Sequence, residues 1–167
     1  MRPVASKPPP ADEVDSDMAH YAVTVSTPLS VSDAFDYIAD LSNFAEWDPG
    51  VREVSQVEGD GTGLGSAYDV TVEGIAGPLT LTYVVTDFTS PDVIVAEARS
   101  TFLTSLDTIT VRADGDGSTV TYDAILTLNG PLGLADAFLA PAFKKIGDKA
   151  AAGLEKVLDG RIVETVS

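Results

Sequence analysis

The sequence predicts an α+β fold in which a curved, seven-stranded antiparallel sheet wraps around one long C-terminal helix. Six segments with alternating apolar residues follow one another between residues 51 and 128, and turns rich in Gly, Pro or Asp separate them. Strands joined by such short turns pair antiparallel. A single long amphipathic segment comes last, and it is the only predicted element large enough to cover the apolar face of the sheet.

The folded domain is predicted to span residues 19–160, with a tail at each end. Residues 1–18 form the N-terminal tail, which we expect to be disordered because it is rich in proline and acidic residues and has few apolar side chains to bury. Residues 161–167 are predicted to be a C-terminal tail. The 167-residue chain is therefore expected to hold one domain, large enough to bury a substantial core.

The first strand is predicted at His20–Val25, where a β-branched run ends before Thr27-Pro28. Two short helices are expected after it. The segment Ser30–Ala39 has apolar residues at helical spacing behind a serine that can cap its N-terminus, and the segment Leu41–Trp47 stops at Asp48-Pro49-Gly50. Both short helices therefore precede the second strand.

The remainder of the chain is predicted to form six strands and the long helix. The strands are expected at Val51–Glu58, Ser66–Glu73, Leu79–Phe88, Val93–Ser100, Leu103–Ala113 and Ser118–Leu128. The long helix is expected at about Leu132–Leu158, and Pro141 is expected to kink it or to separate a first short segment. Helical spacing gathers apolar residues on one side of this helix, namely Leu139, Ala142, Phe143, Ile146, Ala150, Gly153, Leu154 and Val157.

The chain is strongly acidic, with 26 acidic and 10 basic residues and a formal net charge of −16. Such a charge repels nucleic acid and anionic membrane surfaces, so we expect neither as a partner. The lack of cysteine excludes disulfides, thiolate metal sites and thiol nucleophiles. We find no apolar run near the roughly 18 residues of a membrane helix and no signal-peptide core, so we expect no stable membrane insertion and a cytoplasmic location.

Three motifs that suggest chemistry have simpler structural explanations. The segment Gly61–Gly65 is spaced like a phosphate-binding loop, but a strand follows it instead of a helix, so a hairpin or bulge is expected. The segment Asp114–Ser118 begins like a calcium loop, but Thr119 and Ile125 stand where an EF-hand needs Gly and Glu. His20, the only histidine, lies at a strand start and is a poor catalytic base. We therefore predict no metal ion, no cofactor and no catalytic residue.

Strand alternation predicts a ligand pocket on the inner face of the sheet. In the last strand the apolar side chains share the face of Tyr122, and in the strand before it the parity of Ile109 turns Asp107 inward. Several inward tyrosines and one carboxylate provide polar groups among apolar walls, as ligand pockets require. The predicted cavity lining is Trp47, Tyr68, Tyr83, Asp107, Ile109, Tyr122, Phe138, Ala142 and Ile146.

Each of these assignments has a structural alternative. Trp47 is either a packing anchor for the short helices or an indole at the cavity mouth. The tyrosines are either core aromatics with satisfied hydroxyls or cavity walls. Asp107 either faces the cavity, is turned outward by a β-bulge, or pairs with Arg99.

The run Phe35–Val51 resembles the opening of the polyketide cyclase/dehydrase-like branch of the SRPBCC superfamily, which includes the START and Bet v 1-like proteins. Gly63-x-Gly65, Gly117–Tyr122 and Ala152–Leu154 agree with it, and the resemblance covers about residues 19–160. It implies the helix-grip fold. It implies less about chemistry, because members bind lipids, sterols, polyketides and plant hormones, only some are enzymes, and the branch shares no catalytic motif.

Three functions are compatible with these residues. The first is binding or carriage of a small hydrophobic molecule (a lipid, polyketide or isoprenoid-like compound) in an internal cavity, without catalysis. The second is a polyketide cyclase/aromatase-type enzyme, which needs a titratable pair near its ligand. The third is a module that binds a protein partner through an exposed apolar patch and has a closed cavity. The sequence indicates only one inward carboxylate, Asp107, which favours the first function.

Overall fold

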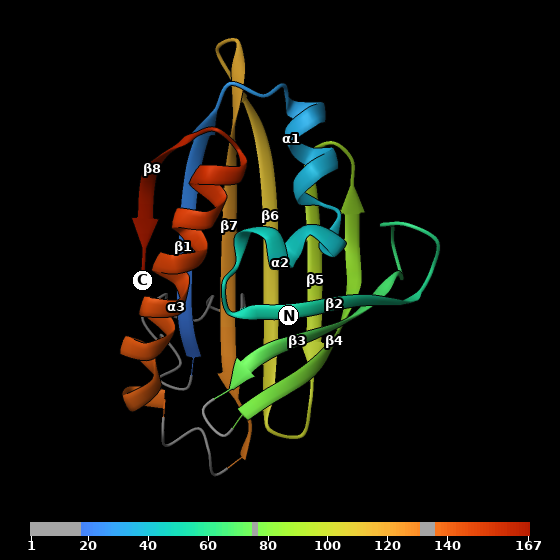
Figure 1. Ribbon diagram of the computed structural model, residues 1–167, viewed down its shortest axis with the longest axis vertical. Coiled ribbons are helices and arrows are strands. Elements are labelled where there is room, and N and C mark those ends of the chain that lie inside the picture. The colour runs from blue at the N-terminus through green and yellow to red at the C-terminus, as the bar shows by residue number, and fades with distance from the viewer. Residues whose placement is uncertain (1–17, 75–76, 131–135) are drawn as a thin grey trace, which may run out of the picture.

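The computed structural model describes residues 18–74, 77–130 and 136–167, except for the side chains of residues 136–139. The predicted N-terminal tail lies outside these residues apart from Met18, which begins the first strand. Within the described residues, one strongly curved sheet holds a long helix and the short helices on the same side (Figure 1). The helix-grip fold expected from the sequence is therefore confirmed.

All neighbouring strands of the sheet pair antiparallel, in the order β2-β3-β4-β5-β6-β7-β1-β8. The strands are β1 (Met18–Thr27), β2 (Val51–Glu58), β3 (Ala67–Gly74), β4 (Gly77–Thr89), β5 (Val93–Arg99), β6 (Leu103–Asp114), β7 (Gly117–Leu128) and β8 (Arg161–Val166). The six strands predicted between residues 51 and 128 are all present, because alternation and turn residues define them locally. The first strand of the sequence lies between β7 and β8 instead of at an edge.

The short helical elements follow β1. Helix α1 (Val31–Ile38) is capped by Ser30, whose side-chain oxygen accepts a hydrogen bond from the Asp33 N–H at 3.1 Å. The 3₁₀ turn η1 (Leu41–Asn43) leads directly into helix α2 (Phe44–Trp47). These two elements cross in front of the central strands (Figure 1), and their apolar side chains therefore point at the middle of the concave face.

The long helix α3 (Asp136–Val157) lies next to β1 and packs against β1, α2 and β8 (Figure 1). It continues through Pro141 as one element, so the predicted first short segment is not separated from it. The predicted start near Leu132 falls outside the described residues. None of the helices in the described ranges is long and apolar enough to cross a membrane.

Two glycines let α3 approach its neighbours closely. A Cβ atom at Gly147 would overlap the aromatic ring of Tyr21 on β1, and a Cβ atom at Gly153 would overlap the backbone carbonyl of Trp47 at the end of α2. The absence of a side chain at these positions thus sets how deeply the helix sits in the sheet.

The C-terminal segment differs from its prediction, because residues 161–166 form a strand and not a tail. Strand β8 pairs with β1 and makes the sheet eight-stranded, one strand more than expected. The Glu155 side chain accepts the N–H of Ile162 at 3.0 Å, which ties the strand to α3. The segment is short, and its apolar residues Ile162 and Val163 are adjacent, so it lacks the strict apolar alternation that reveals the other strands.

Candidate functional site

A buried carboxyl group lies at the middle of the concave face. Asp107 and Ser105 point inward from β6 with exposed fractions of 6% and 7%. The Ser105 hydroxyl donates to one carboxylate oxygen of Asp107 at 3.0 Å, and the Tyr122 hydroxyl of β7 donates to the other at 2.8 Å. Each oxygen therefore accepts one hydrogen bond and keeps a lone pair for another donor.

Small side chains surround this carboxyl group on the sheet. Asp107 is paired with Ala96 of β5 on one side and with Ala124 of β7 on the other, and Ser105 is paired with Ala98. Cross-strand neighbours on one face lie about 5 Å apart, and alanine does not reach over the carboxyl group. The sheet itself thus leaves the space above Asp107 to be filled from elsewhere.

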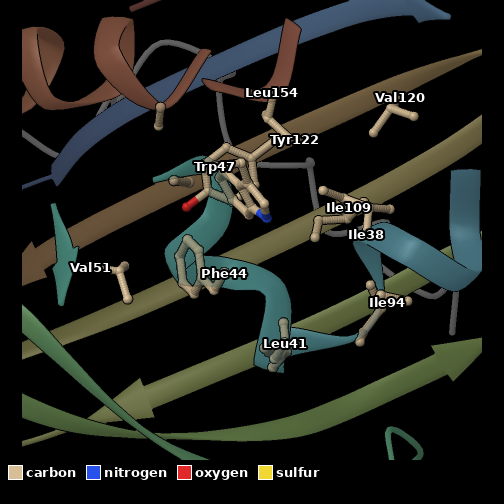
Figure 2. Packing of buried hydrophobic residues seen from close by; sticks show 14 of the residues in the cluster. Ile38, Leu41, Phe44, Trp47, Val51, Ile94, Ile109, Val120, Tyr122 and Leu154 are labelled. Atoms are coloured by element: carbon tan, nitrogen blue, oxygen red, sulfur yellow. The ribbon is translucent and has the colours of Figure 1, made fainter. Parts of the chain in front are cut away.

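The η1–α2 segment (Leu41–Trp47) supplies the groups above the sheet. Figure 2 shows Leu41, Phe44 and Trp47 following one another along this segment, with Trp47 beside Tyr122. The indole of Trp47 and the ring of Tyr122 have centroids 5.2 Å apart at an interplanar angle of 73°, and the rings of Trp47 and Phe44 are 4.6 Å apart. These edge-to-face and tilted contacts are favourable aromatic geometries.

The space left between the sheet and this segment is a cavity of about 10 Å³. That volume corresponds to about one water molecule. Its lining is Leu41, Phe44, Trp47, Tyr83, Ile94, Ala96, Asp107, Ile109 and Tyr122. Asp107 is the one ionisable carboxyl in a lining that is otherwise aromatic and aliphatic.

Burial dominates the electrostatics of this site. Desolvation raises the pKa of Asp107 to about 6, against the lowering effect of the hydrogen bonds from Tyr122 and Ser105. The pKa values of Tyr83 and Tyr122 are raised well above the ordinary value, first by burial and then by the charge of Asp107. Both phenols therefore stay protonated, and Asp107 titrates close to neutral pH.

A second buried carboxyl group lies close to the cavity. Asp48, directly after α2, is 8% exposed and accepts the N–H of Gly50 at 2.8 Å. Burial raises its pKa, and the Gly50 N–H acts in the opposite direction. Its charge in turn raises the pKa values of Asp107, Tyr83 and Tyr122, so the two carboxyl groups repel each other.

Five of the residues predicted to line a cavity come together here: Trp47, Tyr83, Asp107, Ile109 and Tyr122. The β-bulge alternative for Asp107 does not apply, because the pairing of β6 with both neighbours is regular through this position. The ion-pair alternative does not apply either, because Arg99 pairs with Glu97 at 2.8 Å on the surface.

Other predicted lining residues lie elsewhere. Tyr68 is fully buried, but its hydroxyl is hydrogen-bonded to Thr62 at 2.8 Å, and Thr62 lines a separate hollow of about 230 Å³ next to α1. Ala142 and Ile146 are exposed, so their predicted inward orientation is corrected. The side chain of Phe138 lies outside the described residues.

The correction on α3 has a steric cause. The helix turns small residues toward the sheet, and its buried positions are Gly147, Ala150, Ala151, Leu154 and, just after its end, Leu158. Hydrophobic periodicity follows large apolar residues and does not recognise a glycine that is buried by contact with an aromatic ring.

Several lining residues were not among the predicted ones. Phe44 and Leu41 belong to a helical segment whose position over the sheet depends on tertiary packing and not on local pattern. Ala96 could have been found, because the alternating run Ile94-x-Ala96-x-Ala98 replaces large inward residues by small ones in mid-strand. Within the described residues, no three His, Asp or Glu side chains lie close enough together to hold a metal ion.

The fold and the site define a helix-grip protein with a hydrogen-bonded carboxyl group in an apolar, aromatic concave face. The chain belongs to the family described as polyketide cyclase/dehydrase and lipid transport, whose sequence pattern matches residues 18–159. No curated protein matches the sequence.

Solved structures share this fold at low sequence identity. The Zhui aromatase/cyclase from Streptomyces sp. R1128 is 12% identical with a TM-score of 0.70, covering 85% of this chain and 94% of that one. A START superfamily protein from Mycobacterium smegmatis is 14% identical with a TM-score of 0.69, covering 84% and 98%.

A third structure, the di-domain ARO/CYC StfQ from the steffimycin biosynthetic pathway, is 13% identical with a TM-score of 0.66, covering 89% of this chain and 53% of that one. The chain thus spans about half the length of this di-domain protein, and likewise 52% of the di-domain ARO/CYC BexL. At such identities the similarity shows the fold alone.

Proposed function

We propose that the protein binds a small hydrophobic molecule between the sheet and the η1–α2 segment, with Asp107 and Tyr122 as its polar contacts. The observation that carries this proposal is the hydrogen-bonded Asp107–Tyr122 pair, buried among aromatic and aliphatic side chains on an alanine floor. Apolar walls with few, well-placed polar groups are typical of sites for small apolar ligands. The family description, which includes lipid transport, is compatible with this class of ligand.

The energetics of the pair support a functional role. Burial of a carboxyl group is unfavourable, and an apolar side chain of similar size at the same position often stabilises a fold more. Asp107 makes no ion pair with any described basic side chain that would offset this penalty. Ionisable groups kept in such surroundings are concentrated at functional sites.

Binding requires the cavity to enlarge, because about 10 Å³ admits one water molecule, whereas pockets for small molecules have about 300–1,000 Å³. The space would come from movement of the η1–α2 segment, which places Leu41, Phe44 and Trp47 above the alanine floor. This segment consists of a three-residue turn and a four-residue helix. Elements this short are held by side-chain packing more than by their own backbone hydrogen bonds.

The test uses the neutral fluorophore N-phenyl-1-naphthylamine as the probe. We expect micromolar binding, seen as enhanced probe emission and as a change in the emission of Trp47, the only tryptophan. The variant Ala96→Val narrows the space next to Asp107 and should weaken binding at least fivefold. The matched control is the same substitution on the outer face of the sheet, Ala22→Val on β1, which should leave the dissociation constant of the probe within twofold. Absence of micromolar binding to the wild-type protein contradicts the proposal.

Acid–base catalysis of the polyketide cyclase/aromatase type is a second candidate function. It is favoured by one observation that was not expected from the sequence: Asp107 has a second titratable group, the Tyr122 phenol, within 2.8 Å. A carboxyl group with a pKa of about 6 is suited to proton transfer near neutral pH. The solved aromatase/cyclase structures share only the fold at their identities, so this candidate depends on the pair itself.

The catalytic candidate can be tested with a simple aromatic ketone. Proton-to-deuterium exchange at the α-carbon of 1-tetralone, followed by NMR, reports removal of a proton by a base in the site. If Asp107 is a general base, the wild-type protein accelerates the exchange and Asp107→Asn does not. Probe binding without acceleration would leave ligand binding as the function and exclude this form of catalysis.

A protein-binding module with a closed cavity is less well supported. The large apolar side chains that are exposed among the described residues are spread from β2, at one edge of the sheet, to β8 at the other edge. They are Met18, Val57, Leu64, Leu79, Val84, Phe102, Ile146, Val163 and Val166. Single exposed apolar residues are usual on protein surfaces, whereas an interaction site needs a contiguous patch.

A further inference from the structure

We infer that the site selects uncharged ligands that can donate a hydrogen bond and rejects anionic ones such as free fatty acids. This inference rests on the proposed function and adds the chemical class of the ligand. It follows from three features of the concave face, which are the carboxyl groups near the cavity, the location of the basic side chains, and the hydrogen-bonding capacity left at Asp107.

The first feature is the sign of the charges near the cavity. Asp107 lines it and Asp48 lies close by, and both are buried, with exposed fractions of 6% and 8%. The other titratable groups that face Asp107 are the phenols of Tyr83 from β4 and Tyr122 from β7, which are uncharged. Asp123, on the outer face of β7, adds a more distant negative charge. A ligand in the cavity therefore meets a negative potential.

The second feature is the distance of positive charge. All lysines and arginines among the described residues are exposed, and none lines the cavity: Arg52, Arg99, Arg112, Lys144, Lys145, Lys149, Lys156 and Arg161. Half of these also have acidic partners on the surface, in the pairs Arg52–Glu73, Arg99–Glu97, Arg112–Asp92 and Lys144–Asp148. An anionic head group in the cavity would thus be buried without a counter-ion, next to a like charge, which is strongly unfavourable.

The third feature is what Asp107 offers to a ligand. Its two oxygens accept from Ser105 and Tyr122, and a carboxylate has about four acceptor positions, so acceptor capacity remains. A ligand hydroxyl, phenol or N–H group can donate to it, whereas an ionised carboxylate has no proton to donate. Built-in repulsion of one ligand class is a common source of specificity.

The inference is tested with two probes of the same skeleton that differ in charge. N-phenyl-1-naphthylamine is neutral and has an N–H donor, and 8-anilino-1-naphthalenesulfonate is its sulfonated, permanently anionic derivative. We expect the wild-type protein to bind the neutral probe more tightly at pH 8, in about 0.15 M salt, where charges beyond about 8 Å are largely screened. The measured quantity is the ratio of the two dissociation constants.

Variants that each lack one negative charge show whether the carboxyl groups near the cavity determine this ratio. Asp107→Asn should lower the preference for the neutral probe at least fivefold. Asp48→Asn, whose amide oxygen can still accept the Gly50 N–H, should lower it in the same direction and serves if the first variant does not fold. The control Asp116→Asn removes one charge from the exposed β6–β7 turn and should leave the ratio within twofold.

The outcomes separate this inference from the proposed function. If both probes bind and the ratio is the same in the wild-type protein and in both site variants, the charge selectivity is wrong and ligand binding stands. If neither probe binds, the proposed function fails and the inference fails with it. If the control changes the ratio as much as the site variants do, the net charge of the protein causes the discrimination and the inference is again wrong.

Discussion

The rings of Trp47 and Tyr122 pack edge to face, and the hydroxyl of that same tyrosine donates a hydrogen bond to the buried Asp107. One contact thus connects the only tryptophan of the chain, carried by a short helix, to the carboxyl group on the sheet. Displacement of the η1–α2 segment by a ligand would separate the two rings. We therefore expect Trp47 emission to change when a ligand displaces this segment.

The first prediction concerns pH. Burial raises the pKa of Asp107 from 3.8 in the unfolded chain to about 6 in the folded protein, so between these values the folded state binds more protons than the unfolded state. The contribution of this group to stability consequently falls as the pH rises from about 4 to about 6, and it is constant above. Asp107→Asn lacks this group and should not show this dependence. As the pH rises through this range, the free energy of unfolding of the variant should therefore increase relative to that of the wild type by up to about 3 kcal/mol.

Urea unfolding of both proteins at several pH values between 4 and 8 checks this. The difference between the two free energies of unfolding cancels the titration of the other carboxyl groups. Asp116→Asn in the exposed turn is the control for the substitution itself, and it should change the free energy of unfolding by less than about 0.5 kcal/mol. A pH-independent difference for Asp107→Asn would mean that the folded protein does not raise this pKa.

The second prediction concerns the hydrogen bond from Tyr122. Tyr122→Phe removes a donor to a buried carboxylate, and hydrogen bonds to charged groups contribute about 1.5–3 kcal/mol. We expect a loss of this size at pH 8, where Asp107 is ionised, and a smaller loss near pH 5. A double-mutant cycle with Asp107→Asn should give a coupling energy above about 1 kcal/mol at pH 8. Additive effects of the two substitutions would contradict the coupling.

The third prediction concerns the contact between α3 and α2. Gly153→Ala replaces a poor helix former by the best one, which alone would stabilise the helix by about 1 kcal/mol. The added Cβ would overlap the Trp47 carbonyl, however, and overpacking of this kind usually destabilises by about 1–3 kcal/mol. We therefore expect a lower Tm and altered Trp47 emission. The nearby exposed substitution Lys156→Ala should change stability by less than about 0.5 kcal/mol.

The fourth prediction concerns strand β8. Deleting residues 161–167 removes the pairing with β1 and leaves that strand as an unprotected edge. We expect the Tm to fall by at least about 4 °C, roughly 1–2 kcal/mol for a chain of this size, and self-association to increase. Thermal unfolding and size-exclusion chromatography measure both effects. An unchanged Tm would show that the segment behaves as the tail predicted from its sequence.

Most of the fold could be predicted because its signals are local. Alternation, turn residues and helix caps depend on neighbours in sequence, and the inward orientation of Asp107 follows from parity with Ile109 in an unbroken strand. Strand β8 could not be predicted, because it is stabilised by pairing with β1, far away in the sequence, and its own residues do not alternate strictly between apolar and polar. In the first half of helix α3 the predicted apolar side is only partly right, because Phe143 packs against the core whereas Ala142 and Ile146 are exposed. The buried position there is Gly147, which lies against the ring of Tyr21 and gives no hydrophobic signal.

The candidate site was predicted only in part, for a related reason. Residues of the sheet could be placed by parity, and Tyr83, Asp107, Ile109 and Tyr122 do meet at one cavity. What fills the space above them depends on how the η1–α2 segment packs, which no local pattern encodes. The sequence therefore indicated an inner polar group without showing that the cavity above it is nearly filled.

The position of β1 in the sheet also has a consequence for how the chain folds. Its partners are β7, where Met18 pairs with Thr127, and β8, where Ala22 pairs with Val166. Strand β1 is synthesised long before β7 and β8, so both of its backbone edges stay open until those two strands have left the ribosome. Such distant pairing gives a high contact order and slow folding, and nascent chains with open strand edges are prone to aggregate.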